Sequence, residues 1–470
     1  MPLILLLLLR VSKTAVVDIL NVLHVVIVSE GLAQICVRGG IEVPKDSTEF
    51  CLRLSNLSNM ANINITNILE KMTGKDKDYR YMATSDLLSE LNKEGFKADS
   101  DLELKLTSAV LQQLEDAAGD VSGLAVKCLA PLVKKVSEER IMEMANKLCD
   151  KLLNGKDQYR DIASIALKMI IAEVNTPSLA QRILVSLGPE LTKGITNPVS
   201  DFDMDRGRES DKMQTHASTL KKEKRGKGNE IKCECLDILG DTLQKFGNLM
   251  TKDAHEELLI ALLSQLGSNQ ASVRKKSILC IASLASSLPD DLLAKATSEV
   301  VRLLTSKNMK PEFTRTNIQM IGALSRSVGY RFGPHLGESV PLLINYCKSA
   351  SESDEELREY SLQALESFLL RCPRDISPYC DNILNLTLEY LSYDPNFTDN
   401  MEEDTDEEGN EEEEDEYDAS WKVRRAAAKC LQAIIVSRPE MLTMLYAEAC
   451  PKLIERFKER EENVKVLEFF

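Results

Sequence analysis

At 470 residues the chain is too long for one ordinary hydrophobic core, so it forms either several domains or a repeat array whose core extends along one axis. Aromatic residues make up only 5% of the sequence, a composition that suits many amphipathic helices better than sheets. The net charge of −16 comes almost entirely from residues 399–418, which hold 14 acidic and no basic side chains. Because the rest of the chain is near neutral, we expect no direct binding to nucleic acid.

The chain begins with a leucine-rich stretch, Met1 to Leu9, that resembles the apolar core of a secretory signal. No basic residue precedes this stretch, and Arg10, Lys13 and Asp18 interrupt the apolar residues after it. The stretch is also too short to span a bilayer. Residues 1–59 show no repeat pattern, so we expect a leader there that is either poorly ordered or signal-like.

From Met60 onward one pattern recurs: an amphipathic helix, a short polar turn, and a second helix that opens with a polar, an apolar, a basic and a small residue. The basic position falls at Arg80, Arg160, Lys232, Arg274, Arg315, Arg358, Arg424 and Lys465, with Ser122 as a departure. The undisturbed steps measure 38 to 43 residues, close to the ~40-residue period of HEAT units. The pattern predicts about nine units over residues 60–470, with the last one cut short.

Within a unit the apolar residues follow helical spacing. Continuous stripes occupy residues 121–136, 141–153 and 159–171, and no single helix pair could bury them alone. Stacking of neighbouring pairs would cover each stripe. The predicted fold class is therefore all-α, a HEAT/armadillo-type right-handed α-solenoid, which is a superhelix of helical hairpins with the second helices on its inner side.

Two insertions lengthen the regular period. Residues 198–227 carry eight basic and six acidic side chains and few apolar ones, so we expect a disordered insert, or untranslated sequence retained in a gene model. Residues 399–418 form an acidic loop with two interpretations. It is either a solvated loop that repels itself or a lure for a basic partner surface, and the salt dependence of association would separate the two.

The recurring basic residue also has two interpretations, a partner contact or a packing device. Near the start of each second helix, acidic residues precede the basic one, as Asp78 precedes Arg80 and Asp354 precedes Arg358. Such pairs can form a ladder that links successive units and satisfies helix ends. Recurrence at the repeat period favours the structural ladder. The partner-binding residues stay unknown, although side chains of the second helices are the best class to test.

No recognised catalytic pattern occurs in the sequence. The four histidines, His24, His216, His255 and His335, are scattered, and no GxSxG, Walker, GxGxxG or HExxH motif is present. We therefore expect no enzymatic activity, no catalytic residues, no metal and no cofactor.

The twelve cysteines mostly fall at apolar helix positions, where we expect them to act as small core residues. Cys233 and Cys235 form a lone CxC with no second pair and no nearby histidine, so core packing is favoured over zinc binding. Reduced thiols favour the cytoplasm and nucleus.

Seven segments of the repeat region carry a resemblance to a known family: NILEKMT at 67–73, DYRYMAT at 78–84, GLAVKCLAPLV at 123–133, EELREYSLQALESF at 355–368, YDPNF at 393–397, SWKVRRAAAKCL at 420–431 and RFKEREENVK at 456–465. They resemble segments of the cullin-associated and neddylation-dissociated family in its plant form. The resemblance runs from Met60 to Lys465 and includes the acidic loop before Trp421. The chain departs from the family in its leader, in the insert at 198–227 and in its stop soon after Lys465.

The resemblance implies a partner, a cullin with its RING subunit that lacks the ubiquitin-like neddylation modifier. In that family the front repeats cover the cullin C-terminal region and RING subunit, and the rear repeats compete with the substrate adaptor, which promotes adaptor exchange. This chain would carry only the front part, so we expect weaker cullin–RING binding and no adaptor ejection. Nuclear transport receptors, phosphatase scaffolds and a regulator that binds the TATA-binding protein are the rival functions.

Overall fold

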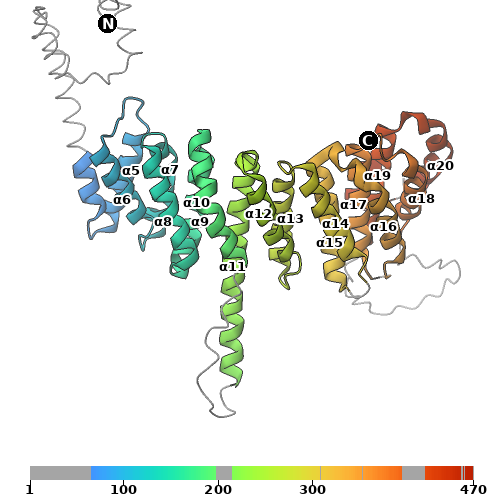
Figure 1. The fold of residues 1–470 in the computed structure, drawn as a ribbon, viewed down its shortest axis with the longest axis horizontal. Helices are drawn as coiled ribbons and strands as arrows, with labels where there is room; N and C mark the ends of the chain where they lie inside the picture. Colours follow the sequence, from blue (N-terminus) through green and yellow to red (C-terminus); the bar gives the residue numbers. More distant parts are fainter. Residues whose placement is uncertain are drawn as a thin grey trace, which may run out of the picture. The chain divides into compact units, whose positions relative to one another are not determined.

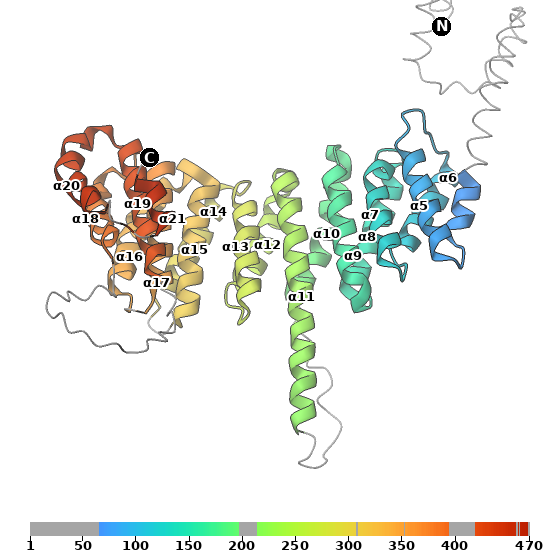
Figure 2. The same ribbon diagram turned by 180° about the vertical axis from the view of Figure 1, so that it is seen from behind.

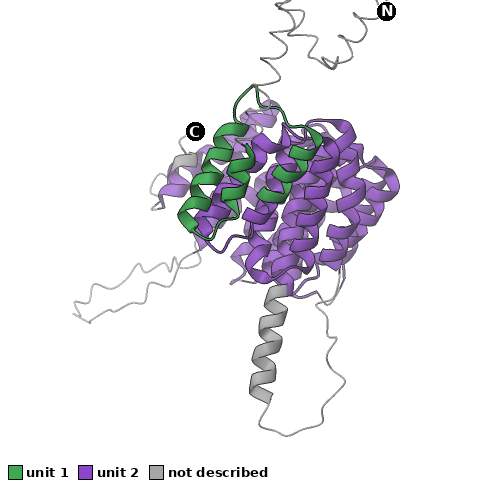
Figure 3. Cartoon of the chain, turned by 90° about the vertical axis from the view of Figure 1, so that its left-hand side faces the viewer, with its two compact units in different colours: residues 1–109 green, residues 110–470 purple. Residues whose placement is uncertain are grey.

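A computed structural model of the chain describes residues 65–196, 214–306, 309–351, 353–393, 419–456, 459 and 461–468. The expected leader at 1–59 and the acidic loop at 399–418 lie outside these residues. The chain divides into two compact units, Met1–Ala109 and Val110–Phe470 (Figure 3).

Helices make up the secondary structure of the described residues, which contain no strand. In the first unit α5 covers Lys77–Leu91, and α6, Ser100–Gln113, begins there. The second unit holds α7 (Gly119–Val133), α8 (Glu138–Asn154), α9 (Asp157–Glu173), α10 (Pro177–Thr196), α11 (Gln214–Phe246), α12 (Lys252–Gln265), α13 (Ala271–Ala285), α14 (Asp290–Leu304), α15 (Pro311–Val328), α16 (Leu336–Ser349), α17 (Glu355–Arg371), α18 (Cys380–Leu391), α19 (Ser420–Ser437), α20 (Leu442–Glu455) and α21 (Glu462–Glu468). Short 3₁₀ turns cover Gly247–Leu249, Gly329–His335, Ser377–Tyr379 and Pro439–Met441.

Local sequence signals set many of the helix ends. The Thr251 side chain accepts a hydrogen bond from the backbone N–H of Ala254 and so caps α12. Pro311 stands at the first position of α15, where its missing N–H costs nothing. At the other end of α15, Gly329 adopts a φ of 61°, a left-handed conformation that glycine accepts without strain.

The predicted apolar stripes are confirmed as core. Residues Val121, Ala125, Cys128, Leu129, Leu132 and Val133 of the first stripe are buried, as are Ile141, Met144, Ala145, Leu148, Cys149 and Leu152 of the second and Ala163, Ala166, Leu167, Ile170 and Ile171 of the third. The flanking Leu124, Val136, Leu153, Tyr159 and Ile162 are half-buried. Helical periodicity alone therefore located the buried face of α7, α8 and α9.

In the second unit the helices form two layers (Figures 1 and 2). The odd layer consists of α7, α9, α11, α13, α15, α17, α19 and α21, and each of these helices packs against the next one in the layer. The even layer consists of α8, α10, α12, α14, α16, α18 and α20. From α8 to α19, each even helix packs against the odd helix that follows it. Two stacked layers with this alternation form an α-solenoid.

The insert predicted to be disordered differs in part from the structure. Residues 197–213 lie outside the described residues, whereas 214–227 belong to α11, which starts at Gln214. The high charge of this stretch suggested disorder. However, Lys, Glu, Arg, Leu and Ala are all good helix formers, so the backbone of α11 can be helical through this highly charged stretch.

Among the described residues, none of the helices has both the length and the apolar composition needed to span a bilayer.

Candidate protein-binding surface

The predicted basic residues all lie on odd-numbered helices, α5 for Arg80 and the odd layer for the others. Three of them, Arg274, Arg358 and Arg424, are buried. Buried guanidinium groups need hydrogen-bond partners, because a charge without them costs several kcal/mol. Their partners therefore show what these side chains do.

Arg274 and Arg315 each reach the next helix of the odd layer. The Nε of Arg274 donates to Thr316 Oγ1 over 2.9 Å, and its NH1 donates to the Ser268 carbonyl over 2.8 Å. Arg315 forms an ion pair with Asp354, with 2.7 Å between Nε and Oδ1. Both contacts join α13 to α15 or α15 to α17, so they link neighbouring units.

Arg424 has the most complete set of contacts. Its Nε lies 2.9 Å and its NH2 3.1 Å from the two carboxylate oxygens of Glu459. Its NH1 donates to the Tyr393 carbonyl over 3.1 Å and to Ser420 Oγ over 2.7 Å. Arg456 also contacts Glu459. This buried pair connects α19 to the turn that precedes α21.

The predicted pairing of Asp354 with Arg358 is wrong. Asp354 accepts a hydrogen bond from the backbone N–H of Leu357 and pairs with Arg315, whereas Arg358 donates to the carbonyls of Ala350 and Ser351. The acid therefore caps its own helix and binds the arginine of the preceding unit. Closeness in the sequence suggested the wrong partner, because the stacking of units determines which arginine lies next to Asp354.

In the first unit, Arg80 donates to the carbonyls of Gly74 and Lys75 over 3.1 and 2.9 Å. The suggested partner Asp78 instead has its backbone N–H bound by Asp76. Residues two apart on a helix do not face each other, which explains why Asp78 and Arg80 do not pair.

The remaining predicted residues form fewer side-chain hydrogen bonds and ion pairs within the described part of the chain than Arg274 or Arg424. Arg160 pairs with Asp157 of its own helix, and Lys232 lies 3.4 Å from Gln265 Oε1. Lys465 is half-buried on α21. Across the set, the contacts close loops and link units, so the ladder role stays the preferred prediction and partner contacts must be sought elsewhere.

The odd face, which we define as the side of the odd layer away from the even layer, carries charged groups on adjacent helices. On α9 and α11, Lys168 Nζ lies 3.3 Å from Glu234 and 3.5 Å from Asp237. Lys276 of α13 lies 2.5 Å from the same Asp237 carboxylate. Burial raises the pKa of Glu234, but the hydrogen bond from Ser164 and the charge of Lys168 outweigh it, so the pKa is lowered overall. Charge in this part of the face is balanced.

Farther along the odd face the balance shifts toward cations. Glu359 and Glu366 of α17 lie within the field of cations on α19, and no ion pair of the described residues joins Glu366 to Arg425 or Lys429. Burial raises the pKa of both glutamates, and the nearby cations only partly oppose it. A partner surface can supply groups of opposite charge to side chains that lie near each other without forming an ion pair.

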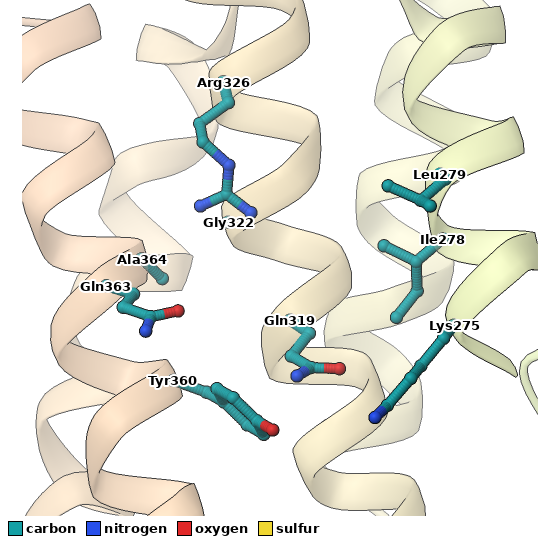
Figure 4. A pocket seen from close by; sticks show the side chains of 9 residues that line it. All are labelled: Lys275, Ile278, Leu279, Gln319, Gly322, Arg326, Tyr360, Gln363 and Ala364. Carbon is teal, nitrogen blue, oxygen red and sulfur yellow. The ribbon is translucent and has the colours of Figure 1, made fainter. Parts of the chain in front are cut away.

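Between α13 and α17 the odd face is hollowed above α15. The hollow measures about 260 Å³ and is lined by Lys275, Ile278, Leu279, Gln319, Gly322, Arg326, Tyr360, Gln363 and Ala364 (Figure 4). These are amide, phenol, cationic and apolar groups, which can bind a side chain of a partner. The sequence did not identify them, because a hollow depends on how three helices approach each other. The signal available was only that they lie on second helices.

Metal-binding groups do not gather in the described residues. No cluster of three or more histidine, cysteine or acidic side chains there could hold a metal ion. His255 is buried, and its Nε2 lies 2.9 Å from the Gly247 carbonyl.

The cysteines predicted to be core residues are confirmed as such at nine described positions. Cys233 and Cys235 are buried in the α-helical core, and the latter lies against Gly194. Burial raises the pKa of Cys128, Cys235 and Cys430 to about 12, so these thiols stay protonated at neutral pH. Cys450 is half-buried.

The two packed layers define a HEAT-type α-solenoid, and solved structures share this fold. Kap95p in a study of its binding to RanGDP aligns with a TM-score of 0.56 and 12% identity, covering 86% of this chain and 46% of the other. Kap121p bound to Nup53p aligns with a TM-score of 0.51 and 13% identity, covering 87% and 40%. At such low identity these likenesses concern the fold alone.

Sequence comparison is more specific, although no known protein-family profile matches the chain. Cullin-associated NEDD8-dissociated protein 1 of Arabidopsis thaliana is 68% identical over 418 residues, which are 87% of this chain and 32% of the relative. Protein 2 of the same name from Mus musculus is 38% identical over 85% of this chain and 31% of the relative. The chain is thus a relative of the cullin-associated NEDD8-dissociated proteins and spans about a third of their length.

Proposed function

We propose that the chain is a non-enzymatic binding protein that holds a cullin together with its RING subunit while the cullin lacks its ubiquitin-like modifier. The observation that carries the proposal is the 68% identity to the Arabidopsis relative over 87% of this chain. At that identity about two thirds of the aligned residues are the same in both chains, so a shared partner is the simplest consequence.

The proposal extends to the wider activity of such a protein. A whole protein of this kind would compete with the substrate-receptor adaptor and promote exchange of adaptors, whereas this chain, which spans about a third of the relatives' length, would bind the cullin–RING pair without ejecting the adaptor. Because cullin–RING ligases without the modifier are the target, we place this activity in the cytoplasm and nucleus.

The odd face supports this function physically. It extends over consecutive helices from α7 to α21, and it presents charged and polar groups rather than a closed cavity. An extended face of this kind suits a large protein partner better than a small molecule, which is usually enclosed by a pocket. Charge complementarity along it would set the register of the partner and the rate of encounter.

Nuclear transport is the second candidate, because the solved structures with the same fold include Kap95p and Kap121p. Their 12% and 13% identities support only the fold. The relatives with identities from 38% to 68% carry cullin-associated names, which favours the first candidate.

A pull-down with the purified 470-residue chain tests the proposal. We expect the chain to retain a cullin–RING pair that lacks the modifier, and to retain much less of the same pair once the modifier is attached. A small GTPase of the transport system serves as the comparison and should not be retained. Equal retention of the modified and unmodified pairs, or of the GTPase alone, would overturn the proposal.

A further inference from the structure

The hollow above α15 differs from the rest of the odd face because it combines an apolar wall with two cations. Ile278 and Leu279 of α13 point from one side toward α15, and Gln363 and Ala364 of α17 lie on the other side (Figure 4). Leu279 is 67% exposed, so the wall is open to solvent. An exposed leucine beside a hollow favours contact with an apolar side chain.

Gly322 creates the hollow. It lies in the middle of α15, and a Cβ added there would sit 3.3 Å from the Cα of Ala364 and 3.2 Å from the NH1 of Arg326. Any larger residue would fill the space between α15 and α17. The pairing of a helical glycine with an alanine on the adjacent helix therefore keeps both the close helix approach and the open volume.

The two cations of the hollow have no ion-pair partner among the described residues. Lys275 and Arg326 stand at different ends of it (Figure 4). None of the nine lining residues is acidic. Burial lowers the pKa of Arg326, and the charge of Arg371 adds to this effect while the charge of Glu366 opposes it. The hollow thus has an excess of positive charge beside an apolar wall.

We infer that the hollow binds an acidic side chain and a neighbouring apolar side chain from one segment of a partner protein. A carboxylate would pair with Lys275 at one end of the hollow or with Arg326 at the other, and the apolar group beside it would cover Leu279. Gln319, Tyr360 and Gln363 supply further hydrogen-bonding groups at the border. A nucleic acid fits less well, because it has no apolar side chain to cover the exposed Leu279. The inference rests on the proposed protein-binding function and names the chemistry of one contact.

A labelled synthetic peptide tests this contact without any cullin. Its centre reads Glu-Leu-Glu between glycine and serine residues, and binding to the full chain is followed by fluorescence anisotropy. We expect saturable binding that weakens about tenfold in Lys275→Glu and in Leu279→Ser. Lys348→Glu, an exposed lysine on α16, is the matched control and should leave affinity unchanged.

A charge-reversed peptide with Lys-Leu-Lys at its centre completes the test. It should bind Lys275→Glu more tightly than the unchanged chain, a result that loss of folding cannot produce. Absence of saturable binding by the acidic peptide, or equal affinity for all three variants, would overturn the inference.

The same variants are then titrated with the unmodified cullin–RING pair. If the pair binds all of them equally, the inference about the hollow fails while the proposed function stands. If the pair does not bind but the peptide behaves as expected, the proposed partner is wrong and the hollow remains a site for acidic segments. Thermal melting of each variant confirms that it is folded.

Discussion

Replacing Arg424 with alanine is expected to lower the free energy of unfolding of the α19–α21 region by about 3 to 5 kcal/mol. The substitution removes four hydrogen bonds to Glu459, Tyr393 and Ser420 and deprives the buried Glu459 carboxylate of the guanidinium group that contacts both of its oxygens. Urea unfolding followed by circular dichroism measures the loss. Arg302→Ala is the control, because its ion pair with Glu299 is exposed and should contribute less than about 1 kcal/mol.

The pH dependence of the same pair gives an independent check. Burial alone would raise the pKa of Glu459, but the hydrogen bonds from Arg424 and the backbone of Glu461 dominate and lower it to about 2. Because the folded-state pKa lies below the ordinary value of 4.5, the charged form stabilises the fold above that value, and this contribution disappears as the pH falls toward 2. The stability difference between the unchanged chain and Glu459→Gln should therefore shrink over that interval. A difference that stays constant from neutral to acid pH would contradict the assignment.

Phe368→Ala is expected to cost about 3 to 5 kcal/mol through the cavity it leaves. The Phe368 side chain is fully buried in α17 and stacks on Phe332, with 5.2 Å between ring centroids. Since α17 packs against both α15 and α19, the loss should spread to both neighbours. Hydrogen exchange of the three helices measures it.

Leu370→Ala provides the control on the same helix. This side chain is about half exposed, so its truncation should change stability by less than about 1 kcal/mol. If Leu370→Ala and Phe368→Ala destabilise the chain equally, the packing described for the odd layer is incorrect.

Much of the fold could be predicted from sequence, because a repeat array shows the same pattern of apolar and basic residues in unit after unit. The spacing of Val121, Ala125 and Cys128 was enough to place a buried helix face, and the recurring basic residue marked an odd-numbered helix wherever it occurred. Periodicity is a local property of the sequence, so it can be recognised without knowing how the helices stack.

Contacts between units could not be predicted in the same way. Asp354 lies four residues before Arg358 but binds Arg315, and charge alone suggested disorder for residues 214–227 that belong to α11. The hollow depends on Gly322 of α15 and Ala364 of α17 meeting across two helices. These features follow from the register of stacked helices, which a single sequence pattern does not specify.

Lysine footprinting tests the central claim, that the odd face binds the cullin–RING pair, most directly. Acetylation rates of individual lysines are measured by mass spectrometry with and without the unmodified pair. We predict that Lys275 and Lys429 on the odd layer become protected while Lys348 on the even layer keeps its rate. Protection of Lys348 with unchanged rates at Lys275 and Lys429 would contradict the account.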